Sequence, residues 1–535
     1  MKKTFISAAA ILAFAATAHA DELSDIQAQA KQLREQMTKR IADLEKRQKA
    51  LEAQKAAVPT ISPVDAMAAD LPYKAAVKAK PPENDDICIK GICVYGNFDM
   101  GAMYQNHGAP FAAVTGGPLD YLVSKNSNGS YFGVAANMIS TSFIGLRGKQ
   151  EIADNLYAVF NLQTLFNPAS GMNASGTGSI ALNNGLTTNL SAQNAFGDSS
   201  KGGQMFNNAA YFGISSPIYG TFTMGRQSAL TSDLIVNYDP LSGSNAWSVI
   251  TYQGANGGGG DTENRILDNS YEYRVNIGPV RLAGEIQARN GGNSGTGNAF
   301  EGNIGFDYLG FSMDFVGGKI FDAISAAPLS PTQLAAANSG PAPVSAGEGL
   351  LAATVSDNTV FSVAARYTLG PWKFWGGYEH IDYANPNNPL NPGAFLQGGM
   401  IGAVLTNTNF TTDKVLQTAW FGVRYSITPA LDITGAYYHE WQNSFVIGNG
   451  TNPTGTCNTA ASAGCSGTLD AVSLVLDWRF AKHVDAFAGV MWSQVNNGLA
   501  NGFLLANGTN AGGINAAGGN HASSFDPGVG LRYQF

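Results

Sequence analysis

The residue types that most often carry out chemistry are sparse in this chain. Its six histidines are scattered, and the His439-Glu440 pair lacks the second histidine of a zinc-protease motif, because Asn443 occupies that position. The chain also has no Gly-x-Ser-x-Gly motif, which would present a nucleophilic serine. The sequence therefore argues against an enzyme.

The four cysteines form two local pairs, Cys88 with Cys93 and Cys457 with Cys465. Four cysteines allow three connectivities in principle. Each local pair closes a short loop, however, and the two pairs lie far apart in the sequence, so we expect both local disulfides. A zinc site would need ligands that converge from these two distant regions. We therefore expect neither a metal nor another cofactor.

Residues 1–20 have the pattern of a secretory signal peptide. Lys2 and Lys3 precede an apolar run over 6–16, and Ala18-His19-Ala20 supplies a small-x-small cleavage site. Export agrees with the disulfides, which persist in oxidising compartments. Removal of Lys2 and Lys3 leaves 29 Lys and Arg residues against 39 Asp and Glu residues, and this acidic balance argues against a nucleic acid partner.

The composition is unusual for a soluble domain. Only 13% of the 535 residues are charged, 44% are hydrophobic and 64 are glycine, whereas about 25% of the residues in an average soluble domain are charged. After residue 20 no apolar run reaches the roughly 18 residues that a membrane-spanning helix needs. The aromatic content of 10% argues against disorder. A large soluble β-protein and a membrane β-barrel remain.

Residues 21–58 contain neither Gly nor Pro and repeat an apolar residue at every seventh position, including Leu23, Met37, Leu44 and Leu51. This heptad pattern predicts a coiled coil with a local slip near Met37, and a single amphipathic helix is the alternative. Residues 59–90 are rich in Pro and Ala, so we expect them to form a linker.

From residue 91 the apolar period changes from seven to two. On 280–289, for example, Leu282 and Ile286 alternate with Glu285 and Gln287, which gives one apolar and one polar face. Seven short turns and eight long Gly-, Asn- and Ser-rich loops connect sixteen such strands. We expect the turns at 152–155, 216–219, 276–279, 309–310, 369–371, 428–430 and 481–483, and the loops at 106–137, 167–207, 229–264, 290–298, 322–358, 384–413, 443–469 and 495–525.

Alternating short turns and long loops are typical of a transmembrane barrel. We therefore expect an all-β fold, a 16-stranded antiparallel transmembrane β-barrel over 91–535, with an N-terminal α-helical coiled coil. A chain of β-sandwich domains is the alternative, but it would rarely place charge on one face of nearly every strand. Strand parity predicts that many charged side chains point inward: Arg147, Lys149, Arg274, Arg281, Arg366, Arg424, Glu272, Glu285, Glu301, Asp307 and Glu379.

Several segments resemble the Gram-negative general porins. They include Val-Tyr-Gly-Asn-Phe-Asp at 94–99, Phe-Ile-Gly-Leu-Arg-Gly at 143–148, Thr-Met-Gly-Arg-Gln at 223–227 and the terminal Phe535. Each segment is weak alone, but their order and spacing over 91–535 are specific. The resemblance implies a homotrimer in outer-membrane lipid, with each barrel a water-filled channel for small hydrophilic solutes and ions. It also implies that Phe535 is the C-terminal assembly signal.

The resemblance further implies that the third long loop, 229–264, folds into the channel. Porin constrictions oppose acidic groups on this loop to a basic ladder on the wall. Here the acidic groups would be Asp233 and Asp239. The basic groups would be Arg226, Arg147 and Lys149.

Two positions complicate this constriction. Strict alternation would place Arg226 on the lipid face, so we expect Gly225 to mark a bulge that turns it inward. The alternative is that Arg226 snorkels at the membrane interface. Phe143 stands where the family often has a basic residue. Together with the acidic mature chain, this difference favours a weak preference for cations.

The amino-terminal helix leaves two functions open. Because the amino termini of parallel barrels emerge on the periplasmic side, three helices could form a trimeric coiled coil there, or each could contact the cell wall. A structural barrel anchored through this helix is an alternative to a channel, and a substrate-specific channel is another.

Overall fold

The computed structural model describes seven residues between 31 and 46 and much of the chain from residue 87 onward. The later described ranges are 87–108, 121, 123–124, 127–173, 205–250, 266–288, 298–328, 350–387, 395–398, 401–408, 410–447, 466–500, 503–504 and 521–535.

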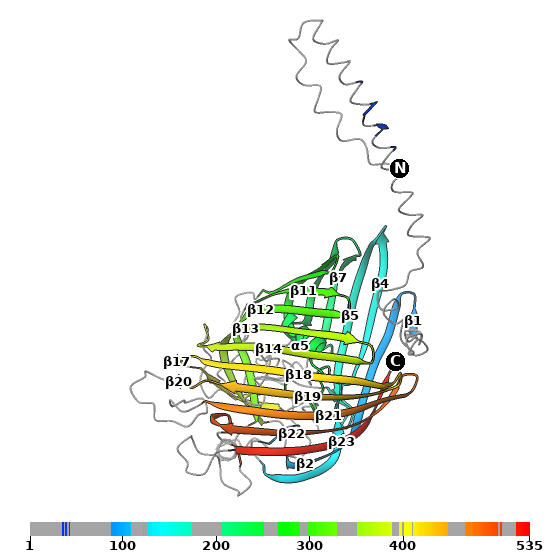
Figure 1. Ribbon diagram of the computed structural model, residues 1–535. Helices are drawn as coiled ribbons and strands as arrows, with labels where there is room; N and C mark the ends of the chain where they lie inside the picture. The colour runs from blue at the N-terminus through cyan, green and yellow to red at the C-terminus, as the bar shows by residue number, and fades with distance from the viewer. Residues whose placement is uncertain are drawn as a thin grey trace. The chain divides into compact units, whose positions relative to one another are not determined.

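Sixteen antiparallel strands form a closed barrel within these described ranges, as predicted (Figure 1). The barrel closes where residues 97–103 of the first strand pair with residues 528–534 of the last. In chain order the strands are β2 (Ile92–Gly108), β3 with β4 (Gly129–Ala136 and Phe143–Ala153), β5 (Leu156–Asn167), β7 (Ala209–Ser216), β8 (Gly220–Ser228), β9 (Ile266–Ile277), β10 (Val280–Gln287), β11 (Ala299–Tyr308), β12 (Phe311–Pro328), β13 (Leu350–Leu369), β14 (Trp372–Ala384), β18 (Lys414–Thr428), β19 (Leu431–Gln442), β21 (Gly467–Ala481), β22 (Val484–Asn497) and β23 (His521–Gln534).

The second barrel strand is interrupted. Both β3 and β4 pair with β2, and residues 137–142 between them leave the ladder. Asn137 has a positive φ of 58°, which turns the chain out of the extended conformation. The smaller elements are β1 (Ile87–Ile89), β6 (Met172–Asn173), α5 (Leu230–Tyr238), β15 (Phe395–Gly398), β16 (Ile401–Asn407), β17 (Phe410–Thr412), β20 (Val446–Ile447) and η5 (Gly498–Ala500).

All seven predicted short turns occur between the strands that they were expected to join. The fifth long loop, predicted at 322–358, is shorter than expected, because β12 continues to Pro328 and β13 begins at Leu350. An irregularity between Ile320 and Ala323 lets the ladder resume beyond the predicted strand end. In the predicted loop 384–413, β16 adds to the edge of β13 in parallel.

The two faces of the barrel wall differ as the period-two pattern predicts. On β10 the side chain of Ile286 is 51% exposed on the outer face, whereas its neighbour Glu285 is 1% exposed toward the lumen. Outward aromatic side chains gather near both ends of the strands, as shown by the contacts of Trp372 with Tyr425 and of Tyr378 with Trp441. Such belts are typical of a barrel in a bilayer.

No helix in the described part of the chain is long and apolar enough to cross a membrane.

The carboxyl terminus closes the barrel against the first strand. The Gly96 amide donates to the Phe535 carbonyl at 2.8 Å, and the Phe535 amide donates to the Gly96 carbonyl at 3.1 Å. The Phe535 ring lies where a Cβ at position 96 would be, since that atom would stand 2.5 Å from a ring carbon. Gly96 is therefore required for this close approach.

Only part of the amino-terminal prediction falls on described residues. All seven described residues between 31 and 46 are helical. Leu23, Met37, Leu44 and Leu51 lie outside the described residues, as do residues 1–20 and 59–86, so the coiled coil stays a prediction. The end of the predicted linker differs, because residues 87–89 form β1 and pair with β2.

The predicted Cys88–Cys93 disulfide is present and joins β1 to β2. Cys457 and Cys465 lie outside the described residues.

Candidate functional site

A segment of the third long loop lies inside the barrel. We call its described part, residues 229–250, the lumen loop; it begins with α5 and continues as irregular chain (Figure 1). Leu230, Leu234, Ile235 and Tyr238 recur at helical spacing and are buried, so the helix presents an apolar stripe to the wall. The lumen loop thus crosses the channel as a packed element.

Wall charges hold both ends of α5. At the amino end, the Thr231 amide and hydroxyl each donate to the Glu301 carboxylate at 3.1 Å. At the carboxyl end, Arg366 donates to the Asn237 carbonyl at 3.2 Å and Arg424 to the Pro240 carbonyl at 3.4 Å. A carboxylate at the amino end and guanidinium groups at the carboxyl end match the helix dipole. The wall therefore fixes the direction of the helix.

Beyond the helix, Asp239 is fully buried and anchors the turn. Its carboxylate accepts a hydrogen bond from the Tyr438 hydroxyl at 2.6 Å and one from the Gly243 amide at 2.7 Å. Burial raises the pKa of this carboxyl above its ordinary value of 3.8, and these two hydrogen bonds oppose that shift. Asp239 consequently serves as a structural link between the lumen loop and β19.

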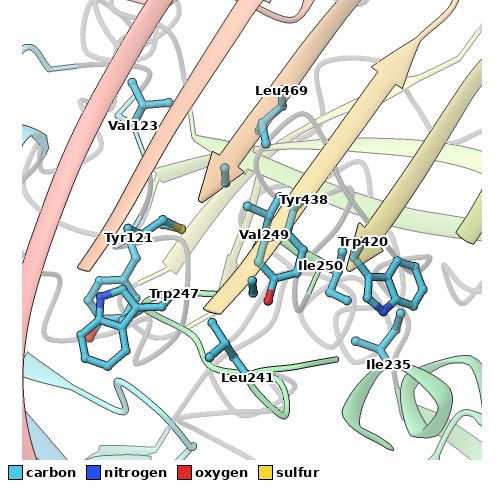
Figure 2. Close-up of a cluster of buried hydrophobic side chains, with 14 of the residues drawn as sticks. Tyr121, Val123, Ile235, Leu241, Trp247, Val249, Ile250, Trp420, Tyr438 and Leu469 are labelled. Atoms are coloured by element: carbon cyan, nitrogen blue, oxygen red, sulfur yellow. The ribbon is translucent and has the colours of Figure 1, made fainter. Parts of the chain in front are cut away.

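Trp247 is the main apolar anchor of the lumen loop (Figure 2). Its side chain is fully buried, its ring meets Phe487 edge-on at 5.9 Å, and its indole N–H donates to the Asp526 carbonyl at 3.2 Å. Gly489 makes room for the ring, because a Cβ there would stand 2.8 Å from it. The end of the lumen loop is thereby fixed to β22 and β23.

The lumen loop also docks on residues 137–142, the interruption of the second strand. The Ser244 hydroxyl and the Ala246 amide both donate to the Met138 carbonyl at 2.9 Å. The Asn245 side-chain amide donates to the Asn137 carbonyl at 2.6 Å. These bonds join the lumen loop to the wall between β3 and β4, whereas α5 contacts β10 to β14.

Asp99 of β2 holds that interruption in place. Its fully buried carboxylate accepts the amide hydrogens of Met138, Ile139 and Ser140 at 3.0, 3.0 and 2.7 Å, and the Ser140 hydroxyl at 3.0 Å. Three converging amides form a small anion nest. Asp99 therefore shapes the surface that receives the lumen loop.

A polar wall runs from β4 to β9. Arg147 lies over the Tyr95 ring at 4.7 Å, and the Tyr95 hydroxyl donates to Asn161 at 2.5 Å. Asn161 is in turn the cross-strand partner of Tyr211 on β7.

Arg274 links this wall to the lumen loop. It forms an ion pair with Asp233 of α5 and donates to Glu272 at 2.6 Å. The lumen loop and the wall thus present charges of both signs to the channel.

Comparison with known proteins agrees with this architecture. A model of the Gram-negative porin family matches residues 7–498, which is most of the chain. The chain belongs to the Gram-negative porin family. It is a porin of the outer membrane, and its family and fold point to a channel rather than an enzyme.

Individual relatives are distant. An outer membrane porin protein of Bordetella pertussis is 25% identical over 150 residues. This match covers 28% of this chain and 31% of the length of that relative. The anion-selective porin from Comamonas acidovorans has the same fold, with a TM-score of 0.51 at 14% identity over 83% of this chain and 99% of that chain. OmpT, an outer membrane protein of Vibrio cholerae, aligns over 84% of this chain and 100% of its own with a TM-score of 0.47 and 12% identity.

The porin's predicted constriction residues have different partners from those expected. Arg226 donates to Asp268 at 2.6 Å and to the Asn207 carbonyl at 2.8 Å, rather than facing Asp233 or Asp239. The backbone is irregular at Gly225, which has a φ of 132°, as expected.

The irregularity does not turn Arg226 inward, because the extra residue lies on β9: Gly225 pairs with Ser270 and Gln227 with Leu267. Gln227 therefore lies on the same face of β8 as Thr223. Its side-chain carbonyl accepts a hydrogen bond from the Thr223 hydroxyl at 2.6 Å.

The other predicted wall cations lie on the porin's polar face. Lys149 lies 4.2 Å from the centre of the Tyr157 ring, and Arg147 is close to Tyr95 as described above. The structure pairs Asp233 with Arg274, an inward residue by parity that the porin motifs did not single out.

Sequence reasoning missed Trp247, Asp99 and Glu301 as supports of the lumen loop. A tryptophan within a polar segment was the only local signal for Trp247. Among the described residues, no group of three or more His, Cys, Asp or Glu side chains could hold a metal ion.

Proposed function

We propose that this porin is a passive channel for small hydrophilic solutes and ions, narrowed by the lumen loop. The observation that supports this function most is the fixation of α5 across the barrel by Glu301 at one end and by Arg366 and Arg424 at the other. A loop anchored in this way narrows the lumen permanently. A wall with paired charges stays wet and binds no solute tightly.

We further propose that the field across the narrowing is set by Asp233 of the lumen loop against Arg147, Lys149 and Arg274 of the wall. The contacts from Arg147 through Tyr95 to Asn161 form a continuous polar surface that leads toward Asp233. Asp239 and Arg226, which were predicted to set this field, act instead through their contacts, Asp239 by holding the loop and Arg226 by pairing with Asp268 at the end of β8.

Planar-bilayer recordings test this constriction. Neutralising Lys149 to Gln should increase the preference for cations, and Asp233→Asn should decrease it, because each change removes one charge from the narrowing. Asp485→Asn is the control, since Asp485 is paired with Arg532 at 2.8 Å and does not contact the lumen loop. Unchanged reversal potentials in both test variants would refute the assignment.

We also propose that the porin is a homotrimer in outer-membrane lipid, with a periplasmic coiled coil built from Leu23, Met37, Leu44 and Leu51. Exposed apolar residues on the outer face of the barrel, such as Phe132 at 77% and Val529 at 58%, support contact with lipid or with another barrel. The heptad pattern supports helix association.

Deletion of 21–58 tests the coiled coil. A lower dissociation temperature of the purified trimer would support helix association, whereas an unchanged temperature would favour a contact with the cell wall. A monomer at all protein concentrations in mild detergent would refute the trimer.

A further inference from the structure

Three cationic side chains lie next to one another on neighbouring strands near the short-turn end of the barrel, which faces the periplasm in outer-membrane barrels. They are Arg366 of β13, Lys373 of β14 and Arg424 of β18. Lys373 and Arg424 are direct cross-strand partners, and Arg366 is the partner of Trp375, two residues along β14. We call these three residues the cationic patch.

We propose that the cationic patch is a binding step for small oxyanions, such as sulfate, phosphate and short carboxylates, on the periplasmic side of the lumen loop. This inference rests on the proposed channel function, because the patch can only be reached through a water-filled lumen.

The patch is distinct because Asp432, the carboxylate that attracts both Lys373 and Arg424, is itself held in an ion pair with Arg479. Within the ranges that the structure describes, none of its three residues forms an ion pair. Five other arginines of the wall do form ion pairs: Arg226 with Asp268, Arg274 with Asp233 and Glu272, Arg281 with Asp307 and Asp314, Arg479 with Asp432, and Arg532 with Asp485.

Placing like charges directly opposite each other across two strands is unfavourable by itself. Lys373 and Arg424 nevertheless occupy such positions. Local rules of this kind are most often broken at functional sites. An anion between the two side chains would remove the repulsion.

The patch is held in place by contacts that leave hydrogen-bond donors free. The Lys373 ammonium and the Arg424 guanidinium lie 4.7 and 5.1 Å from the centre of the Trp375 ring, which is buried. Arg424 also donates to Thr434 and to the Pro240 carbonyl, and Arg366 donates to the Asn237 carbonyl.

A guanidinium carries five N–H donors and an ammonium three, so several donors on the patch remain for a ligand. The planar guanidinium matches the geometry of phosphate, sulfate and carboxylate oxygens. Lys373 is half-buried and so remains accessible from the lumen. A solute that has passed α5 therefore meets a preorganised group of donors.

Competition between chloride and sulfate in planar bilayers tests the inference. In the wild-type porin, sulfate added on the periplasmic side should reduce the chloride current in a saturable manner. Lys373→Gln should raise the sulfate concentration for half-maximal reduction about tenfold, because one charge-assisted interaction is lost. Lys373→Arg, which keeps the charge, should retain the wild-type response. Lys373 is the main target because no hydrogen bond joins it to the lumen loop among the described residues.

Arg532→Gln is the matched control, because it removes one positive charge from the same end of the wall but from an existing ion pair with Asp485. The inference predicts little change in the sulfate response of this control. An equal change in Lys373→Gln and Arg532→Gln would overturn the site, because it would indicate a general field. A wild-type sulfate response in Lys373→Gln would also overturn it, while ordinary chloride current in the same recording would leave the channel function standing. A wild-type protein without any current would contradict the channel function itself.

Discussion

Replacement of Trp247 should release the end of the lumen loop. Its indole is fully buried against residues of β22 and β23, and loss of a buried tryptophan side chain costs about 3–5 kcal/mol. A cost of about 4 kcal/mol lowers the ratio of docked to undocked loop by roughly a thousandfold. Because Glu301, Arg366 and Arg424 still hold the segment from Thr231 to Pro240, we expect only residues beyond Pro240 to leave the wall.

Single-channel recording measures this release. Trp247→Ala should show larger and noisier open-channel current than the wild type. Trp247→Phe keeps a ring and loses mainly the hydrogen bond to the Asp526 carbonyl, worth about 0.5–1.5 kcal/mol, so its current should change much less.

Gly489→Val approaches the same contact from the wall, since a Cβ there would stand 2.8 Å from the Trp247 ring, and should reproduce the noise of Trp247→Ala. Gly435→Ala is the control, because the nearest atom to a Cβ at that position is 4.0 Å away. Wild-type noise in both Trp247→Ala and Gly489→Val would refute the anchoring of the loop by this contact.

Three further changes test separate parts of the structure. Asp99→Asn leaves one acceptor oxygen for the amides of residues 138–140, at a cost of about 1–3 kcal/mol. It should speed amide hydrogen exchange at these residues, whereas the control Asp485→Asn should not. Equal protection from exchange in both variants would contradict the nest. Gly96→Val should lower the yield of folded barrel on heat-modifiability gels, because the new side chain meets the Phe535 ring; a normal yield would show that the terminal contact is dispensable. Burial raises the pKa of Asp239, so docking of the lumen loop should strengthen as the pH falls from neutral toward the ordinary Asp value of 3.8 and weaken as the pH rises through the raised pKa. The denaturation midpoints of the wild type and of Asp239→Asn, compared from pH 7 to pH 4, check this. A difference between the two midpoints that stays constant over this range would contradict it.

The barrel could be predicted from the sequence because its determinants are local. Alternation of apolar and polar residues sets the two faces of each strand, and short turns end them, as at Asn155 and His483, which take the positive φ that a tight turn needs. The role of Phe535 was expected from the resemblance to porins instead, since its contact with Gly96 joins the two ends of the barrel sequence.

The interior of the porin was harder to predict because its contacts join residues far apart in the sequence. No local pattern indicates that Asp99 organises residues 137–142 or that Ser244 then docks there. The face on which Arg226 lies depends on which strand carries the extra residue, and that residue lies on β9 rather than beside Gly225.

Net charge does not describe how charge is distributed along the lumen, for a similar reason. The acidic total favoured a weak preference for cations. Many carboxylates of the wall are neutralised in ion pairs, such as Asp485 with Arg532. The three residues of the cationic patch form no ion pair among the described residues. Selectivity therefore depends on the distribution of unpaired charge along the lumen.

The conductance of the purified porin tests the central claim most directly. We expect stepwise insertions into a planar bilayer, each with a steady current that rises with salt concentration and becomes larger in Trp247→Ala, because the lumen loop narrows an open, water-filled barrel. A folded protein that inserts but passes no current, with Trp247→Ala equally silent, would contradict the channel and favour a structural barrel instead.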